Sequence, residues 1–87
     1  MRISHARDLG IYVREQRRAA GLSQDELATR AGVSRRWLSA FEGGKPSAEV
    51  GLVFHVIVAL GMFVDVSPEP PRELDLDEYL KRFDGPQ

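Results

Sequence analysis

Apolar residues recur at helical spacing through the first half of the chain, and this pattern predicts three short amphipathic helices. The first is expected from about residue 6 to residue 20, where Gly21 ends it. The second is expected over residues 24–31, and the third begins after Ser34 and ends near Glu42, before two glycines. The first half of the chain is therefore expected to be a run of short helices.

Capping residues support these boundaries. Ser4 is the candidate cap of the first helix, and Ser23 with Glu26 three residues later has the spacing of a capping box before the second. Gly32 supplies a left-handed corner between the second and third helices. The hydroxyl of Ser34 can cap the free amides of the third helix.

The third helix has one apolar face and one polar face. Its spacing points Leu38 and Phe41 inward, whereas four residues point outward: Arg35, Arg36, Ser39 and Ala40. A helix, a sharp turn and an arginine-fronted helix form the geometry that places a helix N-terminus in the major groove of DNA. Arg35 is the first candidate for base readout, because a guanidinium can bond both O6 and N7 of guanine. For Arg36, a base contact and a phosphate contact are equally good interpretations.

The segment over residues 50–60 is rich in β-branched residues and can be read as a helix or as a strand. Ser47 as an N-cap and Gly61 as a terminator favour a helix. Apolar side chains surround nearly its whole circumference, while a small domain has a single core in which to bury them. The outer side, with Phe54 and Val58, therefore needs a second protein surface.

A short strand is predicted next, before Pro68, and its five residues are Met62, Phe63, Val64, Asp65 and Val66. No other segment reads as its partner, and an unpaired strand leaves backbone amides and carbonyls unsatisfied. The same strand from a second copy is the simplest partner. The sequence thus predicts a two-fold homodimer with a shared two-stranded sheet.

Residues 68–87 are expected to form a Pro-rich linker and an acidic amphipathic tail, separate from a domain over residues 1–67. Four tail residues share one face at helical spacing: Leu76, Tyr79, Leu80 and Phe83. A helix this short is marginal in water by itself. Two interpretations remain open, namely a tail docked on the body and a tail that binds a partner protein.

Charge is divided unevenly along the chain, although the net charge is only −1. Residues 1–50 carry nine Arg or Lys against six Asp or Glu, whereas residues 51–87 carry three against seven. This division suggests a polyanion-facing front half and a separate partner surface, although ordinary solvated charge is the simpler explanation of the numbers alone.

Several classes of protein are disfavoured by composition. The absence of cysteine excludes disulfides and thiolate metal sites. The longest apolar run is too short to span a bilayer and the N-terminus lacks the apolar core of a signal peptide, so we expect a cytoplasmic protein with no membrane association. No nucleophile–base pair, metal cluster or phosphate-cradling loop is present, so we expect neither an enzyme nor a cofactor.

The combination of Gln24, the Gly32-Val33-Ser34 corner and Glu42-Gly43-Gly44-Lys45 resembles the Xre-like, phage-repressor-type helix-turn-helix family over roughly residues 6–61. The strand after the fourth helix is similar to that of HipB-type antitoxins, whose dimers share such a strand. The resemblance implies an all-α, five-helix-type fold with four core helices. It also implies a homodimeric repressor of its own operon that binds a palindromic operator in double-stranded DNA and a HipA-like kinase toxin.

The resemblance also assigns roles to individual residues. It places Arg35, Arg36, Ser39 and Ala40 at base-reading positions, although apolar Ala40 could touch only a thymine methyl. It places Gln24, Gly44 and Lys45 at phosphate-contacting positions, and Gln24 is also expected to brace the first recognition residue. The residue types themselves add Ser34, Trp37 and Arg18 as candidate phosphate contacts. Glu42 is expected to pair with an arginine of the first helix, either Arg14 or Arg17.

Some alternatives stay open at this point. Packing of Trp37 over Phe41 is slightly favoured over a DNA contact. At the level of the whole protein, the alternatives are a generic Xre-like regulator with no toxin partner and an interaction module that does not bind DNA. Retention of Arg35, Arg36, Gln24 and Lys45 counts against the interaction module.

Overall fold

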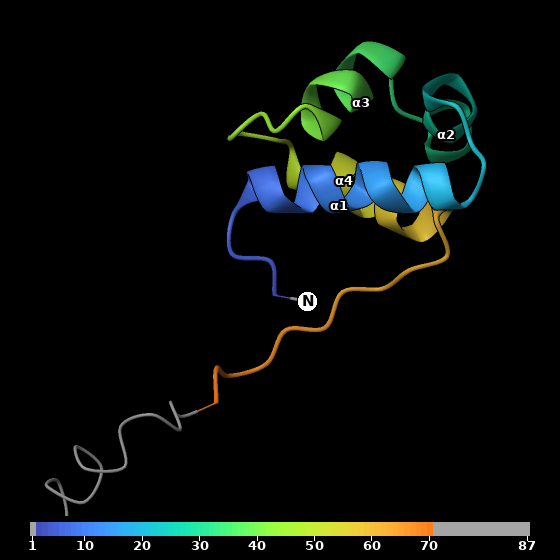
Figure 1. Ribbon diagram of the computed structural model, residues 1–87. Coiled ribbons are helices and arrows are strands. Elements are labelled where there is room, and N and C mark those ends of the chain that lie inside the picture. Colours follow the sequence, from blue (N-terminus) through green and yellow to red (C-terminus); the bar gives the residue numbers. More distant parts are fainter. Residues whose placement is uncertain (1, 71–87) are drawn as a thin grey trace, which may run out of the picture.

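A computed structural model of the chain describes residues 2–70 and contains four helices. These are α1 (Ala6–Ala19), α2 (Gln24–Ala31), α3 (Arg35–Glu42) and α4 (Val50–Ala59). Figure 1 shows α2 and α3 above α1 and α4. Helix α3 packs on α1 and α2, and α2 packs on α4, so the helix-turn-helix pair rests on the other two helices. The predicted amphipathic tail lies outside the described residues.

The predicted caps of α2 and α3 are confirmed. The backbone amide of Glu26 donates to Oγ of Ser23 at 3.0 Å, and the amide of Ser23 donates to the Glu26 carboxylate at 3.0 Å. Gly32 ends α2 with φ 69°, the left-handed conformation that glycine adopts without steric cost. The amide of Trp37 donates to Oγ of Ser34 at 3.0 Å. Each cap satisfies a backbone donor that a helix start leaves free.

The predicted caps of α1 and α4 are wrong. His5, not Ser4, is the N-cap of α1, and Glu49, not Ser47, is the N-cap of α4. Neither cap residue bonds an amide through its side chain. Instead, the backbone carbonyl of His5 accepts from the amides of Asp8 and Leu9, so the start of α1 depends on backbone bonds. The preferred helical interpretation of residues 50–60 is confirmed, and the helix runs over Val50–Ala59.

The core lies between all four helices and is entirely aliphatic apart from one phenylalanine. Its buried side chains are Val13, Leu27, Ala28, Ala31, Leu38, Phe41, Val53, Val56 and Ile57. The inward assignment of Leu38 and Phe41 is therefore confirmed. Because α3 places these two side chains in the core, its rotation about its own axis is fixed, and so is the face that it turns outward.

Gly10 allows a close approach of two helices that the sequence pattern did not reveal. It is buried in the middle of α1, where a Cβ would lie only 1.9 Å from the carbonyl oxygen of Phe41 and 3.0 Å from its carbonyl carbon. Any larger side chain would therefore push α1 away from the C-terminal turn of α3. Glycine at this position sets the distance between α1 and α3.

One side of α4 remains exposed in the single chain. Val50, Phe54 and Val58 lie four residues apart on this helix and are 65%, 47% and 70% exposed. No helix among the described residues is both long enough and apolar enough to cross a membrane. This side of α4 therefore faces away from the core, and its covering by a second protein surface stays a prediction.

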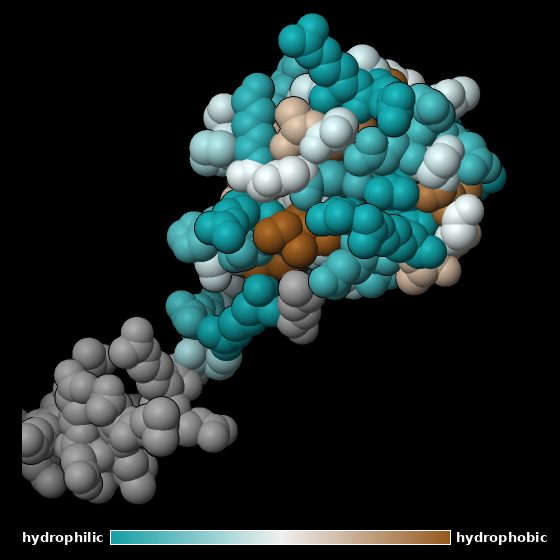
Figure 2. Space-filling view, turned by 45° about the horizontal axis from the view of Figure 1, so that its top comes forward, coloured by the Kyte–Doolittle hydropathy of each residue, from teal (hydrophilic) through white to brown (hydrophobic). Residues whose placement is uncertain are grey.

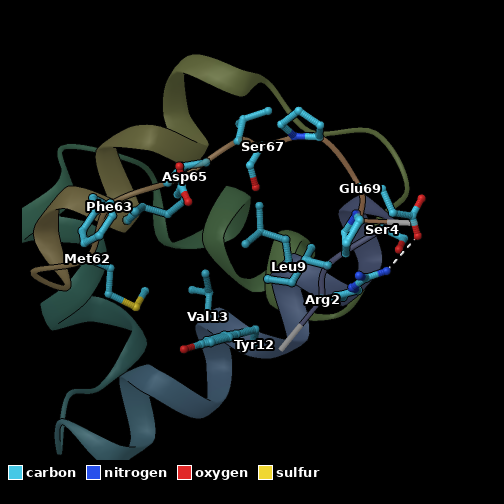
Figure 3. A pocket seen from close by; sticks show the side chains of 16 residues that line it. Arg2, Ser4, Leu9, Tyr12, Val13, Met62, Phe63, Asp65, Ser67 and Glu69 are labelled. Carbon is cyan, nitrogen blue, oxygen red and sulfur yellow. Dashed lines mark hydrogen bonds and ion pairs between the residues drawn. The ribbon is translucent and has the colours of Figure 1, made fainter. Parts of the chain in front are cut away.

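Residues 62–70, which we call the arm, form neither helix nor strand in the single chain. Phe63 and Val66 in the arm are 86% and 90% exposed. A strand needs a paired backbone, so the predicted strand over Met62–Val66 stays a prediction for an assembly. The arm runs past the N-terminal segment, and Nη1 of Arg2 lies 2.7 Å from Oε1 of Glu69. Figure 3 shows the apolar groove between the arm and the body, with Leu9, Tyr12 and Val13 along α1.

Candidate nucleic-acid interface

The N-terminal half of α3 presents its polar residues to solvent. Arg35, Arg36, Ser39 and Ala40 are all exposed, as their outward assignment predicted. Ser34 accepts one amide of the first turn through its oxygen, which leaves its hydroxyl hydrogen available as a donor. Figure 2, in which the α2–α3 end is turned toward the viewer, shows a mainly hydrophilic surface there. This end therefore combines cationic side chains with a helix N-terminus, both of which favour anions.

A buried ion pair beneath this surface fixes α3 to α1. Nε and Nη2 of Arg17 donate to Oε2 and Oε1 of Glu42 at 2.8 Å and 2.9 Å, and Nη1 donates to the carbonyl of Leu22 at 2.8 Å. Both residues are buried, with 8% and 2% of their surfaces exposed. The hydrogen bonds to Glu42 raise the pKa of Arg17 above its ordinary value, against the opposing effect of burial. Of the two predicted partners of Glu42, the structure selects Arg17 rather than Arg14.

Gln24 joins the same network. Its Nε2 donates to Oε1 of Glu42 at 3.2 Å, which links the first residue of α2 to the last residue of α3. Every buried side-chain nitrogen or oxygen in the described part of the chain has a hydrogen-bond partner. The network therefore holds three helices in one relative orientation without leaving a buried charge unpaired. The amide of Gln24 thus contacts Glu42, and not the first residue of α3 that it was expected to brace.

Arg35, the first residue of α3, is instead paired with an acid. Its Nε lies 3.5 Å from Oδ1 of Asp25, the second residue of α2, and both side chains are largely exposed. The residue pattern alone did not indicate a role for Asp25. The pairing depends on the angle between α2 and α3, which residue spacing alone does not give.

Trp37 belongs at least partly to the core. Its ring stacks on that of Phe41, with centroids 5.2 Å apart and planes inclined by 21°. The side chain is half-buried and packs against the buried cluster. The favoured interpretation of Trp37 as a packing residue is confirmed, and its contact with phosphate stays a prediction.

The loop between α3 and α4 carries one exposed cation, Lys45. The amides of Gly44 and Lys45 donate to the carbonyls of Phe41 and Ala40 at 3.1 Å and 3.2 Å, so both amides already end α3. Gly44 has φ 94°, and a Cβ there would lie 3.1 Å from Cγ of Arg7. Two exposed cations thus lie at this end of α3, namely Lys45 in the loop and Arg7 of α1 beside Gly44, and the residue pattern had not indicated Arg7. Contact of Gly44 with phosphate through its amide would require that amide to leave Phe41.

Arg18 follows the buried Arg17 on α1 and is exposed. It lies in the last turn of α1, where a cation is favoured by the partial negative charge of the helix end. The two neighbouring arginines therefore have different environments, because one faces the network under α3 and the other faces solvent. Arg18 retains its place among the candidate phosphate contacts.

A family model for a helix-turn-helix domain matches residues 8–74 of the chain. The chain is also 43% identical over 65 residues to the helix-turn-helix-type transcriptional regulator y4mF of Sinorhizobium fredii, an alignment that covers 75% of this chain and 86% of the relative. The chain belongs to the helix-turn-helix family of transcriptional regulators. A further family member, a regulator of Methanothermobacter thermautotrophicus, is 43% identical over 49 residues, which cover 56% of this chain and 71% of that protein.

The fold of this family member is also that of HipB. The chain superposes on a structure described as a HipB–O4 20mer complex with a TM-score of 0.74, and on one described as a HipA–HipB–O2–O3 complex with a TM-score of 0.75. In both cases the sequence identity is 20%, and the match covers 80% of this chain and 99% of the other. The predicted helix-turn-helix family and the predicted HipB-like fold are thus confirmed.

Proposed function

We propose that this protein is a sequence-specific transcriptional repressor that binds a palindromic operator as a homodimer. The observation that carries the proposal is the exposed, arginine-bearing start of α3 above a fully hydrogen-bonded network. A base-reading helix must be held rigidly, because a small displacement of a bidentate donor loses the contact. The pair Arg17–Glu42 and the core residues of α3 supply that rigidity.

In the proposed complex, the start of α3 enters the major groove. Arg35 donates through its two Nη groups to O6 and N7 of a guanine, while Arg36 reaches a base or a phosphate. Ser39 and Ala40 face the groove one turn further along. Lys45, Ser34, Gln24, Trp37, Gly44 and Arg18 are the candidate backbone contacts. Arg7 joins this set because its stem lies beside Gly44.

A second copy of the chain is the proposed cover for the exposed side of α4. The apolar stripe with Phe54 and Val58 and the exposed arm after it are continuous in sequence, and Phe63, Val64 and Val66 add further exposed apolar surface. Pairing of the strand over Met62–Val66 with its copy across a two-fold axis would satisfy the backbone groups of both arms. The dimer then presents two α3 helices about 34–36 Å apart, which is one turn of DNA.

We further propose that the repressor is the antitoxin of a HipA-like kinase toxin. The HipB-like fold supports this assignment, and the amphipathic tail offers a segment for a partner. Co-purification of the full-length protein with the product of the neighbouring gene tests the proposal, with a variant that lacks residues 74–87 as the comparison. Co-purification with a kinase-like protein is expected, and its loss on truncation would assign that contact to the tail. Failure of the full-length protein to bind such a product would leave a regulator without a toxin partner.

A generic regulator is the second candidate function, because the relatives at 43% identity are described as transcriptional regulators. DNA binding is common to both candidates and can be tested first. Selection of duplexes from a random pool should yield a two-fold symmetric sequence, and Arg35→Ala should reduce discrimination at one base position by about 1–3 kcal/mol. If Arg35→Ala leaves the preference at every base unchanged, Arg35 does not read sequence.

A further inference from the structure

Asp25 and Arg35 form an ion pair across the turn of the helix-turn-helix. Oδ1 of Asp25, in the first turn of α2, lies 3.5 Å from Nε of Arg35, which begins α3. The two side chains are 72% and 64% exposed. An exposed pair of this kind contributes little to the stability of a fold. The pair therefore contributes little to the stability of the fold. Because it lies at the candidate interface, we considered what it does when DNA is bound.

The shortest contact of the pair does not use the terminal nitrogens of Arg35. It joins Oδ1 of Asp25 to Nε at 3.5 Å, so the pair requires neither of the two Nη groups. A guanidinium contacts O6 and N7 of guanine with two of its nitrogens, and two Nη groups suffice for that fork. Asp25 can thus hold the plane of the guanidinium while both Nη groups point to a base.

The charge of Asp25 is unfavourable on a surface that meets phosphates, because like charges repel across an interface. Gln24, the neighbouring residue expected to brace Arg35, donates its Nε2 to Glu42 instead. Among residues 2–70, Asp25 is the acid that forms an ion pair with Arg35. Better discrimination between bases by Arg35 can offset the repulsion between Asp25 and the phosphates.

We propose that Asp25 is the positioning residue for base reading by Arg35. It restricts the rotamers of Arg35 before DNA arrives, and so increases preference for the correct base. At the same time its negative charge lowers affinity for DNA of any sequence. This inference rests on the proposed function, since it requires that Arg35 reads a base.

Three duplexes separate these two effects. They are the operator selected by the full-length protein, the same operator with the base pair read by Arg35 replaced, and an unrelated duplex of equal length. The ratio of the dissociation constants for the first two measures discrimination, and about 5- to 100-fold is expected for the unsubstituted protein. Asp25→Ala should reduce this ratio by about 2- to 10-fold, the effect of one restricted side chain. Its affinity for the unrelated duplex should stay constant or rise.

Matched variants complete the experiment. Glu15→Ala removes an exposed acid from α1 and should leave the ratio unchanged. In an Arg35→Ala background, Asp25→Ala should have no further effect on the ratio, because the group it positions is gone. Asp25→Asn, which keeps the shape but not the charge, should raise affinity for all duplexes and recover part of the ratio. Thermal unfolding of each variant verifies that the domain is folded.

The outcomes distinguish the inference from the function on which it rests. If Arg35→Ala abolishes discrimination while Asp25→Ala preserves it, the repressor function stands and the positioning role is overturned. Equal weakening of Asp25→Ala on all three duplexes would also overturn it, because that result indicates only a contribution of Asp25 to the start of α2. If the unsubstituted protein binds all three duplexes equally, the proposed function fails, and the inference fails with it.

Discussion

Gly10→Ala tests the account of how α1 and α3 pack. A Cβ at this position would lie 1.9 Å from the carbonyl oxygen of Phe41, whereas real Cβ atoms essentially never come within 3.0 Å of such a neighbour. The helices must therefore separate by about 1.1 Å along this direction, the difference of these distances. The atom in the way belongs to the backbone, so no rotamer change can relieve the contact.

The expected cost follows from two opposing effects. Overpacking of a rigid core costs about 1–3 kcal/mol, occasionally more, and backbone contact places this site at the upper end. Replacement of glycine by alanine inside a helix returns about 1 kcal/mol. We expect a net loss of about 2 kcal/mol in the free energy of unfolding, which corresponds to a fall of about 8–16 °C in Tm for a domain of this size.

Urea and thermal unfolding followed by circular dichroism, at one fixed protein concentration, measure this loss. Gly51→Ala is the matched control, because Gly51 is also in a helix but has no atom near its built Cβ. That control should stabilise the protein by about 0.4–1 kcal/mol. If Gly10→Ala is as stable as the unsubstituted protein, the close packing of α1 on α3 is refuted.

Three further predictions concern the Arg17–Glu42 ion pair, the loop after α3 and the capping box of α2. Glu42→Gln leaves the buried Arg17 charge without its counter-ion and should cost about 3–5 kcal/mol in the free energy of unfolding, measured by urea denaturation; a loss below 1 kcal/mol would contradict the role of the pair. Lys45→Ala should weaken binding to all duplexes alike and reduce the slope of log K against log salt by about 0.9, whereas weakening confined to one sequence would argue for a base contact. The pKa of Glu26 is lowered, first by the backbone amide of Ser23 and then by its side chain. The contribution of Glu26 to stability is therefore present above its unfolded pKa and is lost as pH falls through the lower, folded value; Glu26→Gln should flatten this acid-side loss in unfolding curves from pH 7 to pH 3, and an unchanged pH profile would contradict it.

The parts of the fold that were predictable from sequence depend on neighbouring residues. Ser23, Gly32 and Ser34 act within one or two turns of the chain, so their spacing already contains the information. Ser4 and Ser47 have the same chemistry but do not cap, because the backbone of His5 and Glu49 begins each helix one to two residues later. Residue type indicates that a cap is available, and the surrounding fold decides where the helix starts.

The site residues that sequence reasoning missed depend on contacts between helices. The role of Gly10 depends on the position of the Phe41 carbonyl against α1. The role of Asp25 depends on the angle between α2 and α3, which brings it close to Arg35. The choice between Arg14 and Arg17 as the partner of Glu42 also required the rotation of α1. Helical spacing could have excluded Arg14, because Arg17 lies four residues after Val13, on the buried side of the helix.

The central claim is that two copies of α3 enter adjacent major grooves on one face of DNA. Insertion of five base pairs at the centre of the selected operator tests it directly, because about half a turn rotates one half-site to the opposite face of the duplex. Binding measured by fluorescence anisotropy should fall toward the affinity of a single half-site, and a ten-base-pair insertion should restore part of it. Equal affinity for the original and the five-base-pair variant would contradict the two-fold repressor.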